Sequence, residues 1–427
     1  MIGDQRIQLD RLVVAFSRTL DLVHPEMQEH QLRVAYISTC LAQSMGFSRD
    51  ALLDLFVAAS LHDIGMTSAE EEPSALCPDD PARMPWHPEA GYELLRGNRV
   101  LAPVASIVRY HHLPWSHGRG AQSNGTPVPL ASSIIAVADA VERAISPAIP
   151  ILEQAESISE SVTASAGELF HPQVVDAFRR CASGEVFWLD CVSKKIEDLL
   201  LGSIDSASVV IDELALQSIA EVFAHLVDGM SPWTASHSAG VAGASVALAK
   251  ALKFSPREQL LMRTAGYLHD LGKLSVPPAI LDKPGKLTGQ EWAILKGHTY
   301  YTFQILDLIG GLSQLSEWAA FHHERLDGNG YPFHRKANQL TLGSRVMAVA
   351  DVFAALTEDR PYRRGAPPLQ TVSILEKLSS DGGLDADVVA LLKTEREEVI
   401  AASREEQVGY KEQHDRLSEF VANASAA

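Results

Sequence analysis

Apolar residues recur along most of the chain at intervals of three and four positions, the spacing of an amphipathic helix. Residues 261–273, LMRTAGYLHDLGK, follow this spacing and end with Gly and Lys, so we expect a helix that terminates there. Residues 344–361, SRVMAVADVFAALTEDRP, predict another helix that opens at Ser344 and ends before Pro361. Strand-like alternation is scarce. The predicted fold class is therefore all-α, with two tandem helical-bundle domains.

The two domains follow from a repeat of seven polar positions, which recur in the same order in both halves of the chain. The offsets between the copies range only from 207 to 212 residues, and the flanking apolar sequence repeats with them. A single duplicated domain explains this pattern. We place the domains at 1–205 and 206–395, followed by a tail at 396–427. The repeated pairs are His30 and His237, His62 and His269, Asp63 and Asp270, His87 and His298, His111 and His322, His112 and His323, Asp139 and Asp351.

The tail is rich in Glu, Arg, Gln and Ala, a composition that predicts a terminal helix. We expect this helix to be solvated, with a homodimer contact as the alternative.

Composition excludes several broad classes of protein. Hydrophobic residues make up 46% and charged residues 21% of the 427 positions, which are values of a globular rather than a disordered chain. The 54 acidic residues outnumber the 36 basic ones, which argues against a binding face for polymeric nucleic acid. The four cysteines form no CxxC pair, as is usual in a reducing compartment. No apolar run reaches the roughly 18 residues of a membrane helix, so we expect a cytoplasmic protein without a membrane partner.

The His and Asp residues that interrupt the apolar helical sequence are the candidate chemistry of the chain. A buried carboxylate beside an imidazole needs a partner, and a divalent cation can be that partner. An Asp can bridge two cations while neighbouring His residues supply neutral nitrogen ligands, and mixed sets of this kind suit iron, manganese or zinc. Pairs of cations are used for phosphoester hydrolysis. Taken alone, each His would be an ordinary core residue, but their recurrence in two copies favours ligands.

A glycine-containing segment, HHERLDGNGYP at 322–332, lies beside these positions in the second copy. Gly328 and Gly330 permit tight turns near a ligand, and Tyr331 offers an aromatic face on which a base can stack. With LHDLGK before it and VADVFAALTEDRPYRR after it, the segment makes the chain from about Leu226 to Leu392 resemble an HD-GYP domain. This is a bacterial branch of the HD phosphohydrolase superfamily that hydrolyses cyclic di-GMP. The family motif HHExxDGxGYP is matched in full through Pro332.

The resemblance implies a role for each matched residue. Asp270 and Lys273 would be catalytic, Asp270 as the bridging ligand of two divalent cations and Lys273 as a contact to a phosphate oxygen. The cations would be iron or manganese, with zinc, nickel and magnesium as alternatives. The resemblance also implies a cyclic dinucleotide substrate and a contact of the GYP loop with GGDEF-type proteins. The implied metal ligands are His237, His269, Asp270, His298, His322, His323 and Asp351, and the implied substrate contacts are Lys273, Gly328, Gly330, Tyr331, Pro332, Arg360 and Arg363.

The second copy departs from the family pattern at three positions. Gly240 stands three residues after the first His, where family members commonly carry Arg. Ala354 stands three residues after Asp351, where a second acidic residue is common. Trp233 stands where some members carry a Glu that holds a third metal, which favours two metals here.

The first copy is a degenerate version of the same domain. Met66 replaces the Lys of the HDxGK motif, and HHLPWSHGRG replaces the GYP loop. We expect a structural or regulatory domain, with a second active phosphohydrolase as the alternative. Its candidate metal site comprises Glu26, His30, His62, Asp63, His87, His111, His112 and Asp139.

The function that these features favour is metal-dependent hydrolysis of a cyclic dinucleotide by the second copy. Cyclic di-GMP is the first expectation, with a linear dinucleotide and then mononucleotide as products. Alternatives are 3',3'-cyclic GMP-AMP as substrate, and a catalytically weak cyclic dinucleotide receptor, which Gly240 and Ala354 motivate. A nucleoside monophosphate substrate is disfavoured by the GYP loop.

Overall fold

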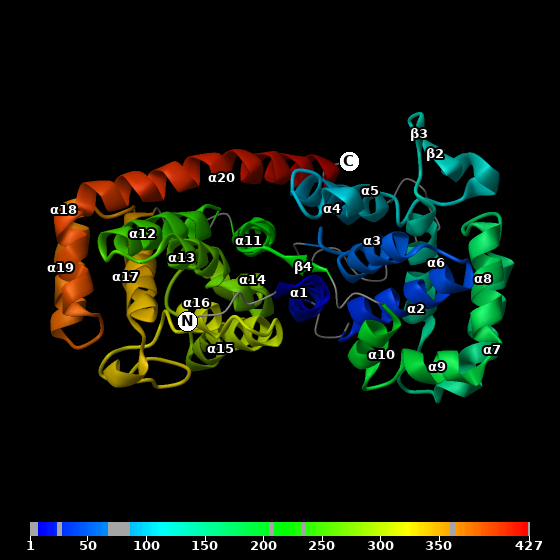
Figure 1. Ribbon diagram of the computed structural model, residues 1–427, viewed down its shortest axis with the longest axis horizontal. Helices are drawn as coiled ribbons and strands as arrows, with labels where there is room; N and C mark the ends of the chain where they lie inside the picture. Colours follow the sequence, from blue (N-terminus) through cyan, green and yellow to red (C-terminus); the bar gives the residue numbers. More distant parts are fainter. Residues whose placement is uncertain are drawn as a thin grey trace. The chain divides into compact units, whose positions relative to one another are not determined.

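The computed structural model describes residues 7–23, 28–66, 86–204, 209–231, 235–358 and 364–425. The chain divides into two compact units, an N-terminal unit at 8–210 and a C-terminal unit at 211–426. Helices account for most of the described residues (Figure 1), which confirms the all-α class. None of the described helices is both long and apolar enough to cross a membrane.

The N-terminal unit is built from ten α-helices within the described residues, with a short hairpin between the fifth and sixth. The hairpin pairs β2 and β3 in antiparallel register, Gln122 opposite Pro127. The elements are α1 (Leu9–Val23), α2 (His30–Ser44), α3 (Arg49–Ser60), α4 (His87–Leu95), α5 (Ala102–Arg109), η4 (Ser116–Ala121), β2 (Gln122–Ser123), β3 (Thr126–Pro127), α6 (Leu130–Ala144), α7 (Ile151–Ala164), α8 (Pro172–Ala182), α9 (Glu185–Cys191) and α10 (Ile196–Ser203). Two further two-residue strands, β1 (Ile7–Gln8) and β4 (Val210–Ile211), fall at the limits of the units in the sequence.

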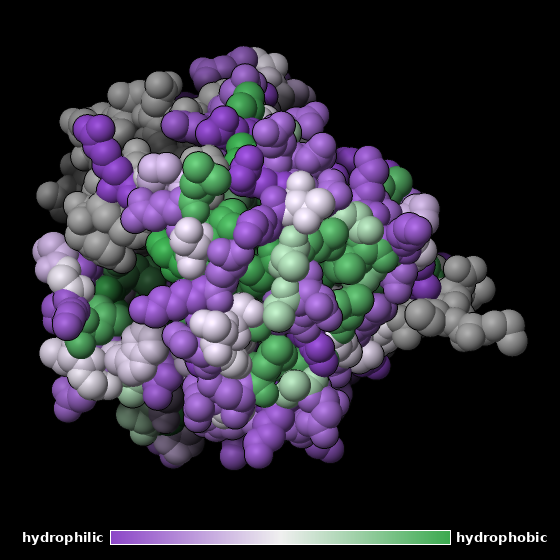
Figure 2. Space-filling view, turned by 90° about the vertical axis from the view of Figure 1, so that its left-hand side faces the viewer, coloured by the Kyte–Doolittle hydropathy of each residue, from purple (hydrophilic) through white to green (hydrophobic). Residues whose placement is uncertain are grey.

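The C-terminal unit repeats this helical order and ends in a long helix. Its elements are α11 (Glu213–Gly229), α12 (His237–Ala251), α13 (Pro256–Leu268), η5 (Leu271–Ser275), α14 (Pro278–Leu281), α15 (Gly289–Leu308), α16 (Ser313–Ala320), η6 (Ala337–Gln339), α17 (Leu342–Thr357), α18 (Pro368–Ser380), α19 (Ala386–Thr394) and α20 (Arg396–Ser425). Seen from the side of α18 and α19, hydrophilic side chains surround scattered apolar patches (Figure 2).

Side-chain caps determine where several helices of the C-terminal unit begin. Ser255 and Glu258 form a reciprocal capping box at the start of α13, with Pro256 in the first turn. Thr341 caps α17 by accepting a hydrogen bond from the Ser344 amide, so this helix begins before Ser344 and not at it. The expectation that the helix at 261–273 ends with Lys273 is also wrong. The helix ends at Leu268, and Lys273 belongs to the following 3₁₀ turn.

The helix break between α13 and η5 places the segment with the His269-Asp270 pair in close contact with α15. A Cβ atom on Gly272 would lie 1.9 Å from the carbonyl oxygen of His298, so no other residue fits there without a backbone shift. The N-terminal unit repeats this contact, since a Cβ on Gly65 would lie 2.0 Å from the carbonyl oxygen of His87. The third residue after each His is therefore Gly because two backbone segments meet there.

Helix α12 is the central element of the C-terminal unit and packs against α13, α17 and α20. It consists largely of Ala, Gly and Ser, which allow other helices to approach closely. The expectation of a solvated tail is wrong for the first four turns of α20, because Val399, Ser403 and Tyr410 are buried. The Tyr410 ring stacks on His225, with 3.8 Å between ring centroids. The beginning of α20 is thus part of the core of this unit.

Replacing Gly243 of α12 with Ala should lower the free energy of unfolding by about 1–3 kcal/mol. The physical reason is overpacking, since the added Cβ would lie 2.4 Å from the carbonyl oxygen of Ala402 in α20. Gly409→Ala is the matched control on α20, where an added Cβ meets nothing within 4 Å. It should leave stability unchanged or raise it by about 0.5–1 kcal/mol. Denaturant unfolding followed by circular dichroism measures both, and equal effects would contradict close packing of α20 on α12.

Candidate active site and metal centre

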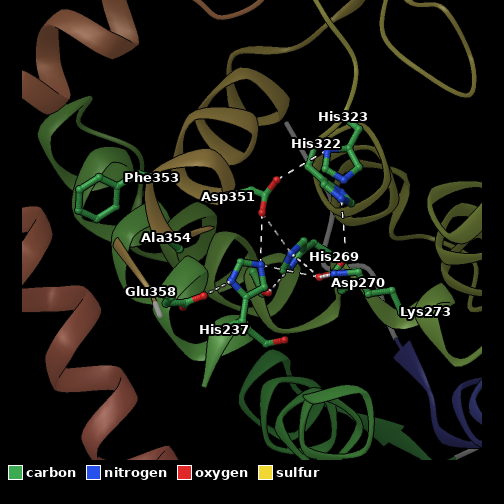
Figure 3. Close-up of polar contacts among 12 residues, drawn as sticks. His237, His269, Asp270, Lys273, His322, His323, Asp351, Phe353, Ala354 and Glu358 are labelled. Carbon is green, nitrogen blue, oxygen red and sulfur yellow. Dashed lines mark hydrogen bonds and ion pairs between the residues drawn. The ribbon is translucent and has the colours of Figure 1, made fainter. Parts of the chain in front are cut away.

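The seven residues predicted as ligands in the second copy lie together in the C-terminal unit. Figure 3 labels all of them except His298. His237 is the first residue of α12, His298 lies in α15 and Asp351 lies in α17. The His-Asp pair lies at the end of α13, and the His-His pair directly follows α16. All seven are buried except His323, whose side chain is 30% exposed. A cluster of five imidazoles and two carboxylates is therefore assembled from residues far apart in the sequence.

Asp270 lies between two halves of this cluster. Its Oδ2 lies 3.2 Å from Nε2 of His269 and 3.8 Å from Nε2 of His237. Its Oδ1 lies 3.4 Å from Nε2 of His298 and 3.8 Å from Nε2 of His322. A carboxylate that turns one oxygen to each half has the geometry of a bridging ligand.

Asp351 joins the same two halves from α17. Its Oδ1 lies 3.3 Å from Nε2 of His237 and 3.8 Å from Nε2 of His269. Its Oδ2 lies 3.7 Å from Nδ1 of His323, the ligand candidate nearest the solvent. Each half of the cluster thus combines imidazole nitrogens with carboxylate oxygen.

Backbone carbonyl groups orient three of the imidazoles. Nδ1 of His269, His298 and His322 lies 2.6 to 2.8 Å from the carbonyl oxygen three residues earlier in the chain. When Nδ1 donates this hydrogen bond, the lone pair of Nε2 faces the carboxylate of Asp270. Nε2 of His269 is buried and has no hydrogen-bond partner among the described residues. Lone pairs that face a carboxylate oxygen repel it unless a positive charge lies between them, so the residues present fit divalent cations.

Burial and neighbouring charge shift the pKa values of the cluster in different directions. Burial lowers the pKa of His298 to about 3, so this imidazole is neutral at pH 7. Burial also opposes protonation of His237, but the carboxylates of Glu358 and Asp351 together outweigh burial and raise the pKa of His237 to about 10. Burial would raise the pKa of Asp270, yet the neighbouring His269, Lys273 and His298 hold this pKa well below its usual range. A cation bound at His237 must therefore displace a proton.

The predicted phosphate contact Lys273 lies at the edge of the cluster. Its Nζ is 2.5 Å from Oδ2 of Asp270, and its side chain is 19% exposed. The ammonium group therefore neutralises part of the charge of the bridging carboxylate while it remains accessible from solvent.

The GYP loop lies on the His323 side of the cluster. The Tyr331 ring is 5.0 Å from the His323 ring, measured between centroids. Gly328 has a φ of 80°, which favours glycine, and a Cβ on Gly330 would lie 2.4 Å from the amide nitrogen of Arg325. Both glycines are therefore required by the backbone. Pro332 follows in the same loop, next to Tyr331.

Glu324 holds the GYP loop in place through hydrogen bonds to its backbone. This residue was not among the predicted site residues. It is buried, and its carboxylate accepts hydrogen bonds from the amides of Phe333 at 2.7 Å and Arg335 at 2.8 Å. The sequence signal was present, because Glu324 is the acidic residue of the HHE motif.

Two further residues compensate for the absence of charged side chains at Gly240 and Ala354. Glu358, at the end of α17, accepts a hydrogen bond from Nδ1 of His237 at 2.9 Å (Figure 3). Gln407 of α20 donates to Glu358 at 3.1 Å. A Cβ on Gly240 would lie 2.6 Å from Nε2 of Gln407, so this glycine makes room for the glutamine. The chain therefore orients His237 through residues that the family pattern does not indicate.

The N-terminal unit orients its equivalent imidazole with the residues that the family pattern does indicate. Glu142, three residues after Asp139, lies 2.6 Å from Nδ1 of His30. Arg33, three residues after His30, donates to Glu142 at 3.5 Å. The two units thus orient the equivalent imidazoles, His30 and His237, with different side chains.

The predicted second metal site assembles in the N-terminal unit with the same division. Oδ2 of Asp63 lies 3.2 Å from His62 and 3.4 Å from His30, while Oδ1 lies 3.2 Å from His87 and 3.9 Å from His111. The remaining predicted residues of the site, His112 and Asp139, lie in the same cluster. Nε2 of His30 and of His62 are buried without a hydrogen-bond partner in the described chain. These residues also fit divalent cations.

A different cation lies beside the bridging carboxylate of the N-terminal unit. Met66, at the position of Lys273, is buried and uncharged. Arg143 of α6 instead donates to Oδ1 of Asp139 at 2.7 Å, and its Nη2 lies 3.8 Å from Oδ2 of Asp63. The GYP loop is replaced by η4 and the β2–β3 hairpin.

Several predicted positions lie outside the described residues. They are the candidate ligand Glu26, the candidate phosphate contacts Arg360 and Arg363, and Trp233.

Comparison with known proteins relates both units to one domain type. The chain matches models of the HD domain at residues 27–144 and again at 221–388. It is 31% identical to 3'3'-cGAMP-specific phosphodiesterase 1 of Vibrio cholerae, over 90% of both chains. It is 27% identical to 3'3'-cGAMP-specific phosphodiesterase 3 of the same organism, over 92% of this chain and 95% of the relative. A cyclic di-GMP phosphodiesterase of Thermotoga maritima is 41% identical over 31% of this chain and 37% of its own.

A solved structure shares the fold. The crystal structure of a cyclic GMP-AMP specific phosphodiesterase of V. cholerae superimposes with a TM-score of 0.61 and 24% identity, over 94% of this chain and 98% of that one. This likeness extends over both units.

Substitution of Glu358 by Gln should weaken Mn²⁺ binding by the C-terminal cluster about 10- to 100-fold, because His237 loses the charged group that orients it. Gln407→Ala should weaken it less, since it removes only the support of Glu358. Competition with a fluorescent chelator measures the affinity, and Glu405→Gln, an exposed position on α20, is the control. Unchanged Mn²⁺ affinity in both variants would contradict a positioning role.

Proposed function

The chain belongs to the HD-GYP family of tandem HD-domain proteins, and from this premise we propose that its C-terminal domain hydrolyses a cyclic dinucleotide. The observation that carries the proposal is the division of the C-terminal cluster by Asp270, with Lys273 beside it. Hydrolysis of one phosphodiester bond converts the cyclic substrate to a linear dinucleotide. Hydrolysis of the second bond yields mononucleotide.

Two divalent cations per site are the cofactor that we propose, held by the seven residues of the cluster with Asp270 between them. Iron or manganese are the metals that this donor set favours, with zinc, nickel and magnesium as alternatives. When bound, such cations activate water as the nucleophile and neutralise the negative charge that grows on the phosphoryl oxygens.

The chain's own residues bind and orient the substrate in this proposal. Lys273 exchanges its contact with Asp270 for a non-bridging phosphate oxygen and acts as a point charge. The Tyr331 ring, which lies against His323, offers a stacking face for a base. Gly328, Gly330 and Pro332 fix the loop that carries it. Arg360 and Arg363 complete the phosphate contacts.

The identity of the bases separates two candidate substrates. The HD-GYP motif supports cyclic di-GMP, as does the 41% identity to the T. maritima cyclic di-GMP phosphodiesterase. The relatives that match nearly the whole chain, N-terminal unit included, support 3'3'-cyclic GMP-AMP. Metal and phosphate contacts are common to both nucleotides, so discrimination falls to groups around the bases.

We also propose a domain arrangement, partners and a location for the protein. We place the domains at 1–205 and 206–395 and the helical tail at 396–427, with the N-terminal domain as a degenerate regulatory or structural copy. Its cluster, together with Glu26, is a second metal site. We further propose a cytoplasmic location, a homodimer contact on the exposed face of α20, and contact of the GYP loop with GGDEF-type proteins.

Hydrolysis of a panel of cyclic dinucleotides by protein loaded with manganese or iron tests the proposed activity. The wild type should cleave cyclic di-GMP or 3'3'-cyclic GMP-AMP, and Asp270→Asn should lower kcat at least about 1000-fold because it removes the bridging charge. Asp63→Asn is the matched control in the duplicated cluster and should retain most of the activity. Lys273→Met should lower kcat/KM by about 10- to 100-fold through loss of one charged phosphate contact.

One outcome would overturn the proposal of an enzyme in favour of a receptor. This is tight binding of the cyclic dinucleotides by the metal-loaded wild type with no hydrolysis.

A further inference from the structure

A large cavity lies within the N-terminal unit, next to the duplicated His and Asp cluster. Its volume is about 1090 Å³, and it is lined by residues of α2, α6 and α7 and of the segments at 145–150 and 165–170. Helices α6 and α7, which both contribute to its lining, pack against each other. Small-molecule sites typically have volumes of about 300–1000 Å³, so this cavity is large enough for such a ligand. We propose that this cavity is a second ligand site, separate from the C-terminal active site, that binds a phosphorylated nucleoside.

One wall of the cavity is apolar and partly open to water. Ile151, Ile158 and Val162 of α7 form its buried part. Ile149 is 46% exposed and Leu169 is also 46% exposed at its rim. Large aliphatic side chains exposed around a concave surface favour contact with an apolar group, and the flat face of a base is such a group.

Two guanidinium groups, of Arg33 and Arg143, line the end of the cavity next to the His and Asp cluster. Arg143 is held by Asp139 at 2.7 Å, and Arg33 makes two long hydrogen bonds, to Glu29 at 3.3 Å and to Glu142 at 3.5 Å. Arginine binds phosphate through a planar set of donors, frequently with two parallel hydrogen bonds. The arrangement of an apolar wall with cations at its end matches a base linked to a phosphate.

Comparison of the two units gives independent support for an anion at this end. Lys273 contacts Oδ2 of the bridging Asp270, and it is the residue that binds phosphate in the proposed reaction. The N-terminal unit has buried Met66 at that position, but Arg143 brings a cation to within 3.8 Å of the equivalent oxygen of Asp63. The positive charge has thus been retained at the bridging carboxylate although the side chain and the helix that supply it have changed.

His30 connects the cavity with the cluster, because it lines the cavity and belongs to the candidate metal site. A nucleotide in the cavity would therefore place its phosphate near the position that the substrate phosphate occupies in the other unit. This unit lacks Lys273 and the GYP loop of the proposed reaction, and the cavity has Arg33, Arg143 and the apolar wall as its contacts. We therefore assign the cavity to binding and not to turnover.

Equilibrium dialysis of the full-length Asp270→Ala variant tests the proposal without hydrolysis of the probe. The probes are radiolabelled 3'3'-cyclic GMP-AMP, cyclic di-GMP, GMP and AMP. We expect a binding site that persists in this background and whose affinity falls at least 10-fold when Arg143→Met is added. A cyclic dinucleotide at this site identifies the substrate as the ligand, and a mononucleotide identifies the product, and either supports the proposal.

Two further variants separate ligand binding from folding. Ile149→Glu places a negative charge at the exposed rim, where it should not disturb the core, and it should also weaken binding at least 10-fold. Arg179→Met, an exposed arginine of α8 outside the cavity lining, is the control and should leave binding unchanged. Thermal unfolding of each variant checks that the N-terminal unit is folded.

Three results would overturn the proposal. The first is nucleotide binding that neither Arg143→Met nor Ile149→Glu changes, and the second is the lack of a second site for any probe. The third is a homodimer in sedimentation that Ile149→Glu dissociates while nucleotide binding is unaffected, because the apolar rim would then be a contact between two copies of the chain.

Discussion

A buried carboxylate that faces several imidazole nitrogens is the constraint on which the structure of each unit depends. Asp270 and Asp63 are both almost completely buried, and their oxygens lie within 4 Å of two imidazoles each. An ionised carboxylate in this environment is very costly without positive charge nearby. The helix break that places the buried His-Asp pair in the cluster, the close glycine contacts beside it and the carbonyl groups that orient the imidazoles all serve this arrangement. Cations are the partners that these residues fit.

The duplication shows which parts of the arrangement can change. The positions of the candidate ligands and the division of the cluster by the central Asp are the same in both units, whereas the residues around them differ. His30 is oriented by Glu142 and Arg33, while His237 is oriented by Glu358 and Gln407. Helix α20 therefore supports the C-terminal cluster through Gln407, whereas the corresponding support in the N-terminal cluster, Arg33, comes from α2. A substitution of Gln407 can therefore alter the orientation of His237 through Glu358.

Much of the site could be predicted from the sequence because it repeats. The offsets between the copies identified all seven positions of each cluster, and apolar spacing identified the helices. Helix ends were less predictable: the capping residue of α17 is Thr341, and not the Ser344 that the pattern suggested. Gly240 and Ala354 looked like losses because a sequence pattern records fixed spacings. Gln407 reaches Glu358 from a helix whose packing depends on tertiary structure, so no spacing rule could locate it.

The proposed chemistry requires cations at the two sides of Asp270. Anomalous diffraction from crystals grown with Mn²⁺ measures their positions. We expect two anomalous peaks in the C-terminal cluster, one among His237, His269 and Asp351 and the other among His298, His322 and His323, with Asp270 between them. Crystals of Asp270→Asn should lose at least one of these peaks. Absence of both peaks from wild-type crystals, or peaks away from Asp270, would contradict the role of Asp270 as a ligand shared by two cations.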